Sequence, residues 1–197
     1  WRKKVVEYKP DVIISSIVED TYYLWNKFMD QISDRKFISV VGGVFVTYYP
    51  QAFEGKCDYI CRGEGDEAIP ELMNFIEQGK DGHHLQNIHP NPMRPALNVN
   101  TLPPTDHEIF DKRSLYRPFQ GKIIKVATVE TQRGCPFKCK FCNSPSNAVT
   151  YKDETDSLFF RHRTVEHIEM EIQHLIKTID VEFLWIVTDT LLTTSKK

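Results

Sequence analysis

Three cysteines close together in one loop constrain this chain more than any other feature of its sequence. Cys135, Cys139 and Cys142 are separated by three and then by two residues. A loop this short must turn its thiolates toward one centre, and thiolates select iron–sulfur clusters or zinc over hard cations. The spacing alone leaves three alternatives: a cubane cluster with one open iron, a zinc site completed by a histidine, or a group of structural thiols.

The sequence on both sides of the loop has the pattern of a strand–helix–strand unit. Residues 123–129 form an apolar run directly before the loop. Downstream, Thr164 has the character of an N-cap, and apolar residues recur at helical spacing from Val165 to Ile179. The continuous apolar run from Phe183 to Val187 predicts a strand buried on both faces. The loop is therefore expected within a parallel α/β arrangement.

The upstream half predicts a second α/β unit. Apolar runs at Val12–Ile17 and Phe37–Val41 bracket a helical pattern, which indicates a strand–helix–strand crossover. The second run ends at Gly42-Gly43, and Gly63-Glu64-Gly65 leads into another helical pattern. Paired glycines at strand ends let a backbone approach a flat cofactor. Both segments also fit simpler roles: Gly42-Gly43 as a plain turn, and Gly63-Glu64-Gly65 as a loop that starts a helix.

The segment from Glu130 to Cys142 resembles the cluster loop of radical S-adenosylmethionine (SAM) enzymes, and Phe141 before the last cysteine fits that pattern. The resemblance implies that Cys135, Cys139 and Cys142 hold a [4Fe-4S] cluster whose open iron chelates SAM. Reduction then cleaves SAM to a 5'-deoxyadenosyl radical. Phe141 would lie near the adenine, or alternatively pack under the loop.

The order of motifs in the upstream half is similar to the Rossmann-like cobalamin-binding domain of cobalamin-dependent radical SAM enzymes. The resemblance implies a row of residues along the cobalamin edge: Ser15, Ser16, Gly42, Gly43, Gly63, Glu64 and Gly65. The segment from Ile186 to Leu192 looks like the end of the second barrel strand in that family. Asp189 is the candidate for holding the SAM amino group, although a lone aspartate there also fits a turn. Thr188 departs from the family pattern, which has an acidic residue at this position.

The predicted fold class is α/β, with an incomplete Rossmann-like cobalamin-binding domain followed by the first strand–helix–strand portion of a radical SAM (β/α)6 partial barrel. The expected domains are residues 1–86, a proline-rich linker at 87–121, and the N-terminal part of the barrel at 122–197. Prolines exclude a continuous helix or central strand from the linker. No Asp-x-His-x-x-Gly motif occurs, and we expect an internal fragment of a longer enzyme, with an open barrel and exposed sheet edges.

The resemblance implies an enzyme, most commonly one that methylates an unactivated carbon with methylcobalamin. Cyclases and rearrangement enzymes of the family are an alternative. Methylthiotransferases carry three further cysteines upstream, whereas only Cys57 and Cys61 precede the loop here. A structural zinc module is the non-enzyme alternative. Whether the fragment alone is active is left open.

Composition fits an ordinary soluble protein. Hydrophobic residues make up 41% of the chain, and no apolar run approaches the roughly 20 residues of a membrane span. The net charge of -2 gives no drive toward nucleic acid, although Arg133, Lys138 and Lys140 make the cysteine loop locally basic. The cysteine usage favours a reducing cytoplasm over a disulfide framework. Expected partners are a small-molecule substrate and an electron donor such as flavodoxin or ferredoxin.

Overall fold

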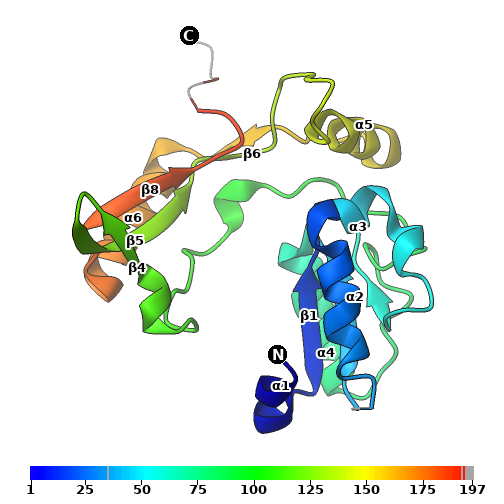
Figure 1. The fold of residues 1–197 in the computed structure, drawn as a ribbon. Helices are drawn as coiled ribbons and strands as arrows, with labels where there is room; N and C mark the ends of the chain where they lie inside the picture. Colours follow the sequence, from blue (N-terminus) through cyan, green and yellow to red (C-terminus); the bar gives the residue numbers. More distant parts are fainter. Residues whose placement is uncertain (35, 192, 194–197) are drawn as a thin grey trace. The chain divides into compact units, whose positions relative to one another are not determined.

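The computed structural model describes residues 1–34, 36–191 and 193, and divides the chain into two compact units (Figure 1). The first comprises Trp1–Leu97 with Val149–Ser157, and the second Asn98–Ala148 with Leu158–Lys197. The helices and strands, in chain order, are α1 (Arg2–Tyr8), β1 (Val12–Ser16), η1 (Glu19–Thr21), α2 (Tyr22–Asp30), β2 (Ile38–Gly42), α3 (Val44–Tyr48), η2 (Pro50–Phe53), β3 (Tyr59–Ile60), α4 (Gly65–Glu77), η3 (Val99–Thr101), η4 (Lys112–Leu115), β4 (Tyr116–Phe119), β5 (Lys122–Glu130), β6 (Gln132–Arg133), α5 (Ser144–Thr155), β7 (Arg161–His162), α6 (Val165–Ile179) and β8 (Phe183–Val187).

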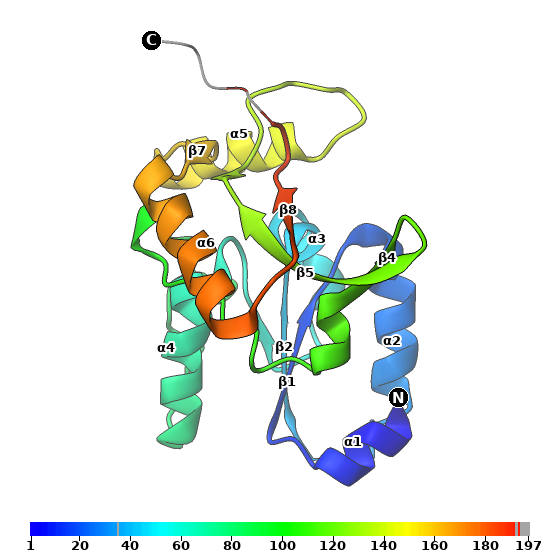
Figure 2. The same ribbon diagram turned by 90° about the vertical axis from the view of Figure 1, so that its left-hand side faces the viewer.

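The first unit is built on a parallel sheet with the strand order β1-β2-β3. The register pairs Val12 with Ile38 and Ser16 with Gly42. Helix α2 connects β1 to β2, which confirms the predicted crossover. Helices α2 and α4 lie on opposite faces of this sheet, as Figure 2 shows. Each face of the sheet is therefore covered by helix, as in a Rossmann-like layer arrangement.

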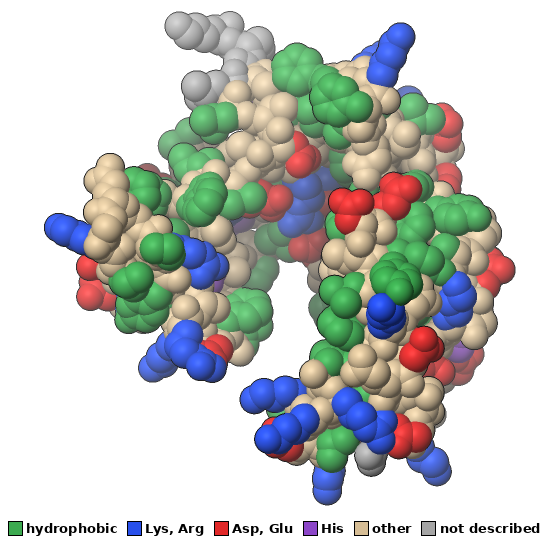
Figure 3. All heavy atoms as spheres, in the orientation of Figure 1, with side chains coloured by type: hydrophobic (Ala, Val, Ile, Leu, Met, Phe, Trp, Pro, Cys, Tyr) green, Lys and Arg blue, Asp and Glu red, His purple; other side chains and the backbone are tan. Residues whose placement is uncertain are grey.

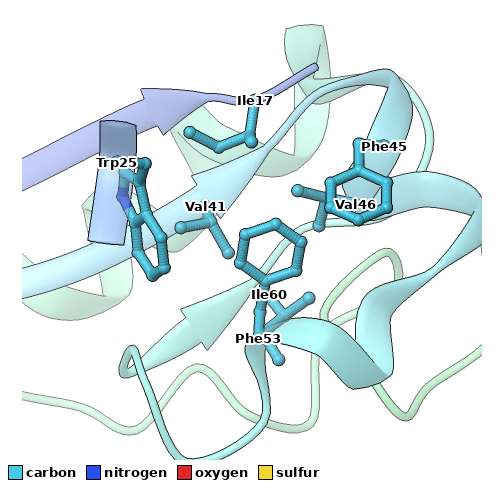
Figure 4. Close-up of a cluster of buried hydrophobic side chains, with 7 residues drawn as sticks. All are labelled: Ile17, Trp25, Val41, Phe45, Val46, Phe53 and Ile60. Atoms are coloured by element: carbon cyan, nitrogen blue, oxygen red, sulfur yellow. The ribbon is translucent and has the colours of Figure 1, made fainter. Parts of the chain in front are cut away.

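Alternating residues of the strands supply two separate cores. Val41 and Ile60 point to the face of α2 and α3, where they pack with Trp25 and Phe53 (Figure 4). Their neighbours Val40 and Tyr59 belong to the cluster on the other face, which includes Leu72 of α4. The two-residue period of a strand explains this division. Because Phe53 is fully buried, its side chain stabilises the unit by roughly 1.5–3 kcal/mol.

In the second unit, β5 pairs with β4 on one side and with β8 on the other. The β5–β8 pair is parallel, and Ala127 and Val129 of β5 pack against Leu175 and Ile179 of α6. The hydroxyl of Thr164 accepts a hydrogen bond from the backbone N–H of His167 at 3.2 Å, which confirms the predicted N-cap. Among the described residues, this sheet has the strand order β4-β5-β8 and does not close into a barrel.

The burial predicted for β8 is wrong. Phe183, Trp185, Ile186 and Val187 are exposed, and Trp185 keeps 57% of its surface accessible. The cause is that β8 is an edge strand in the sheet of the described residues, with β5 as its neighbour. A continuous apolar run predicts burial only where both faces of a strand are covered.

A buried ion pair fixes the end of β5. The Arg163 guanidinium pairs with the Glu171 carboxylate, and these side chains are 7% and 3% exposed. Arg163 Nη1 also donates to the backbone oxygen of Glu130 at 2.8 Å, at the last residue of β5. Burial raises the pKa of Glu171, but hydrogen bonds from Arg163 and Thr105 outweigh it and leave the pKa lowered. The charged pair therefore connects α6 to the strand that precedes the cysteine loop.

Charged and hydrophobic side chains are mixed over the visible surface of both units (Figure 3). In that view, Lys and Arg side chains gather over the end of the first unit that carries α1. No helix among residues 1–34, 36–191 and 193 is long and apolar enough to cross a membrane.

The exposed His83 predicts a pH-dependent contribution to stability. Its Nδ1 lies 2.5 Å from an Asp81 carboxylate oxygen and its Nε2 lies 3.0 Å from the backbone oxygen of Asp58. The hydrogen bond to Asp81 raises the pKa of His83, so the charged ring stabilises the fold at pH values below the unfolded pKa of about 6.5. This stabilisation is lost as the pH rises through the folded pKa.

We expect His83→Asn to lower the free energy of unfolding at pH 6 and to have a smaller effect at pH 9. The effect at pH 6 should be modest, because the ion pair is exposed to solvent. Urea denaturation at both pH values measures the difference. An equal loss of stability at the two pH values would contradict the assigned role of the imidazolium.

Candidate functional site

A cavity of about 260 Å³ lies where the three strands of the first unit end. Because parallel strands have their carboxyl ends at one edge of a sheet, residues that follow different strands meet there. The cavity contains all the residues predicted for the cobalamin edge except Glu64. Its lining consists of Ile14, Ser15, Ser16, Gly42, Gly43, Cys61, Gly63, Gly65 and Ile69.

Gly43 lies so close to the end of β1 that a side chain does not fit. Its φ is +103°, and a Cβ there would lie 2.7 Å from the backbone nitrogen of Ile17 and 2.8 Å from its oxygen. Both contacts are to backbone atoms, which cannot move aside as a flexible side chain would. The wall of the cavity is therefore bare backbone at this point, as the paired glycines predicted.

Thr47 of α3 connects the two glycine segments that line the cavity. Its hydroxyl donates to the Gly43 oxygen at 2.9 Å and accepts from the Gly63 N–H at 3.0 Å. Thr47 is 4% exposed, so water has little access to compete for these two hydrogen bonds. Thr47 could not be predicted as a support of the cavity, because no local sequence pattern indicates its partner at Gly63.

Asn87 fixes the turn at residues 62–64. Its amide nitrogen donates to the backbone oxygens of Arg62 at 2.7 Å and Glu64 at 3.2 Å, and its amide oxygen accepts from the Arg94 N–H at 2.8 Å. Asn87 is 2% exposed and has a φ of +68°. It was expected only as the first residue of the linker. Its burial and left-handed φ are properties of the fold, so the sequence of this proline-rich segment carried no signal for the role.

Glu64 points away from the glycine-lined cavity. Its Oε2 accepts a hydrogen bond from the Leu97 N–H at 3.0 Å, and it lines a separate small cavity with Arg94 and Tyr151. In this position its carboxylate stabilises the chain segment that leaves the first unit.

Of the upstream cysteines, Cys61 is buried and Cys57 is half-buried, and both are neutral thiols. Burial raises the pKa of Cys57 to about 12 and that of Cys61 to about 11. A thiol with such a pKa is protonated at neutral pH, and metal ligation requires the thiolate. Cys61 therefore contributes to the cavity as a small, weakly polar side chain.

The cysteine loop follows β5 and β6 in the second unit. Gly134 precedes it with a φ of +84°, and a Cβ there would lie 2.6 Å from the backbone oxygen of Phe159. Cys135 is half-buried, whereas Cys139 and Cys142 are exposed, and all three are free thiols. The Cys142 N–H donates to the Cys139 oxygen at 3.2 Å, and Cys142 Sγ accepts from the Ser144 N–H at 3.4 Å.

The structure does not gather the three thiols into a metal site. Within the described part of the chain, no three His, Cys, Asp or Glu side chains lie close enough together to hold a metal ion. The donor set nevertheless suits an iron–sulfur cluster, because three accessible thiols on a short loop are chemically able to ligate iron. Their assignment as ligands stays a prediction.

Asp189 lies at the same edge of the sheet as the start of the cysteine loop. The register of the parallel β5–β8 pair sets Glu130 opposite Val187, so the segments after both residues leave the sheet together. Gln132 Nε2 donates to Thr190 Oγ1 at 2.7 Å, which links these two segments directly. Asp189 is exposed, and Phe141 is 94% exposed. Gln132, which is buried, was missed because its partner is distant in sequence.

Comparisons with known proteins agree with this arrangement. No protein-family model matches the chain. An uncharacterized methyltransferase of Pyrococcus horikoshii is 27% identical over 160 residues, which are 72% of this chain and 33% of that protein. An anaerobic magnesium-protoporphyrin IX monomethyl ester cyclase of Rubrivivax gelatinosus is 25% identical over 200 residues, 92% of this chain and 34% of that protein.

A solved structure matches nearly the whole chain. It is the radical SAM methyltransferase TsrM from Kitasatospora setae, solved with cobalamin and a [4Fe-4S] cluster bound. The TM-score is 0.57 at 15% identity, and the match covers 95% of this chain and 39% of that one. The chain thus resembles the cobalamin-dependent radical SAM enzymes, in fold through TsrM and in sequence through the methyltransferase and cyclase above. The family resemblance and the predicted fold class are confirmed. The chain spans about a third of the length of these curated relatives.

Replacing Gly63 with alanine should destabilise the protein more than the same change at Gly55. Both glycines have left-handed φ values, of +73° and +71°, so each substitution costs roughly 1–2 kcal/mol in backbone strain. A Cβ at Gly63 would also lie 2.8 Å from the Tyr151 hydroxyl, whereas none of the surrounding atoms lies within 4 Å at Gly55. We expect Gly63→Ala to cost about 1–3 kcal/mol more. Urea denaturation measures the free energy of unfolding of both variants. Equal losses would contradict the prediction and would mean that Tyr151 moves aside at little cost.

Proposed function

We propose that the chain forms the cofactor-binding portion of a cobalamin-dependent radical SAM enzyme that methylates an unactivated carbon of a small-molecule substrate. The observation that carries the proposal is the loop of three free cysteines after the carboxyl end of β5, in a chain with the fold of TsrM. Catalytic groups of parallel α/β folds lie at this end of the strands.

When bound, a [4Fe-4S] cluster supplies the electron that cleaves SAM to a 5'-deoxyadenosyl radical, and cobalamin supplies the methyl group. Cys135, Cys139 and Cys142 are the proposed iron ligands. The exposed Phe141 ring is free to stack on the adenine, and the Asp189 carboxylate is free to bind the amino group of SAM. Phe141 lies on the segment that follows β5, and Asp189 lies on the segment that follows β8.

The glycine-lined cavity is the proposed contact with cobalamin. Bare backbone at Gly42, Gly43 and Gly63 lets part of a large, flat cofactor approach the strand ends closely. Ser15 and Ser16 supply hydroxyls at the same edge. This chemistry suits an uncharged corrin edge better than a highly charged ligand, because the lining contains no ionised side chain.

The proposed partners are a small-molecule substrate and an acidic electron-transfer protein such as flavodoxin or ferredoxin. Lys138 and Lys140 are exposed beside the cysteines and are able to attract a negatively charged donor.

Replacing Cys139 with alanine should abolish cluster binding while leaving the first unit folded. Two thiolates are too few to hold a cubane cluster, and Cys139 is exposed, so its removal leaves no cavity in a core. Anaerobic reconstitution with iron and sulfide, followed by iron analysis, measures the loss. Electron paramagnetic resonance of the reduced wild-type chain should show a cubane signal that shifts when SAM is added.

Cys57→Ala is the matched control, because it also removes one thiol but lies outside the loop. It should retain the iron content of the wild-type chain. Unchanged iron in Cys139→Ala would refute the ligand assignment, and stoichiometric zinc in place of a cluster would overturn the enzyme proposal.

Cyclisation is a second candidate function, because the match to the magnesium-protoporphyrin cyclase covers 92% of the chain. The two candidates differ in what happens to the methyl group of SAM. A methyltransferase that uses methylcobalamin must methylate cobalamin again after each turnover, whereas a cyclase need not. With reduced cobalamin and SAM, we therefore expect S-adenosylhomocysteine and methylcobalamin to form. Chromatography detects both products, and their absence from a chain that binds both cofactors would favour cyclisation.

A further inference from the structure

The segment Val149–Ser157 packs against the cavity turn although it follows the cysteine loop in sequence. It belongs to the first unit, together with residues 1–97. The Glu154 carboxylate accepts two hydrogen bonds from Arg62, from Nη2 to Oε1 at 2.6 Å and from Nη1 to Oε2 at 3.1 Å. Arg62 is the residue directly before Gly63, so this bidentate pair lies beside the glycine wall of the cavity.

The Arg62–Glu154 pair differs from an ordinary surface ion pair. The side chains are 14% and 34% exposed, which limits screening by water and salt. The Arg62 Nε also donates to the Thr47 backbone oxygen at 3.2 Å. One guanidinium therefore connects α5, α3 and the cavity turn, and its planar shape fixes their relative orientation.

Tyr151, one turn earlier in α5, packs against Gly63 but does not line the cavity. It is 2% exposed, and its hydroxyl lies so close to Gly63 that a Cβ at that position would be 2.8 Å away. Gly63 therefore has the Tyr151 hydroxyl close to its Cα and donates its N–H to the Thr47 hydroxyl. The backbone that lines the cavity has little room to move.

We propose that Glu154 and Tyr151 are positioning residues for cobalamin: they hold the turn at Arg62–Gly63 in the form that lines the cavity. This inference rests on the proposed function of that cavity. A turn held in its binding conformation loses less conformational entropy when the ligand binds, so the affinity rises without a direct contact. Neither residue lines the glycine-lined cavity itself.

The test compares Glu154→Gln with Asp153→Asn in the full chain. Both variants remove one carboxylate charge from adjacent exposed positions of α5, but only Glu154 binds Arg62. Equilibrium dialysis with hydroxocobalamin should show a dissociation constant about fivefold higher for Glu154→Gln, a typical effect of losing one charged hydrogen-bonded pair. Asp153→Asn should match the wild-type chain.

Amide hydrogen exchange supplies a readout that needs no cobalamin. The Arg62 N–H donates to the backbone oxygen of Asn87 at 2.7 Å, and the Gly63 N–H donates to Thr47 Oγ1 at 3.0 Å. Peptides that span these residues should therefore be protected from exchange. Glu154→Gln should speed exchange in these peptides and leave the β1 and β2 peptides unchanged. A general rise in exchange would indicate global destabilisation and would overturn the local role.

The outcomes separate the inference from the function on which it rests. A wild-type chain that fails to bind hydroxocobalamin overturns the proposed function, and the inference with it. Binding by the wild-type chain and equal binding by Glu154→Gln overturns the inference alone. Weaker binding together with faster local exchange, both absent from Asp153→Asn, supports it.

Discussion

The parallel pairing of β1, β2 and β3 is the constraint on which the glycine-lined cavity depends. Parallel strands deliver their carboxyl ends to one edge, so Ser16, Gly42 and Cys61 meet although the sequence between them is long. The alternation of Val40 and Val41 between two cores requires helices on both faces of this sheet. Slipping β2 by one residue would move each valine into the core on the opposite face, where it would not fit, so the two cores also hold the strand ends in register.

Parallel pairing also organises the second unit. Because β5 and β8 are parallel, the cysteine loop and Asp189 both follow strand ends at the same edge of the sheet. Here the register is reinforced by polar contacts. Arg163 binds the oxygen of Glu130 and pairs with buried Glu171, and Gln132 bonds to Thr190. A buried charge pair is costly to break, because either partner left alone keeps an uncompensated charge. The base of the cysteine loop is therefore more strongly fixed than its exposed tip.

Periodicity predicted the strands and helices well, because alternation and helical spacing are local properties. The run Phe183–Val187 forms a strand with those bounds, and Thr164 caps α6. The burial of β8 was wrong, since burial depends on what covers a strand. Thr47, Asn87 and the Arg62–Glu154 pair were missed for a related reason: each acts through partners distant in sequence. Glycines at strand ends indicated the cavity, whereas the side chains that support it carry no local signal.

The two candidate sites differ in how far they are formed before a cofactor binds. The cavity is held by Thr47, Asn87 and the α5 contacts, so its glycine wall already has the shape that a ligand would meet. The cysteine loop has a fixed base, but the described residues do not form an assembled ligand set there. Ordering such a loop uses part of the metal-binding free energy. Cobalamin affinity should therefore depend on residues that never touch the cofactor, whereas cluster affinity should depend chiefly on the ligands themselves.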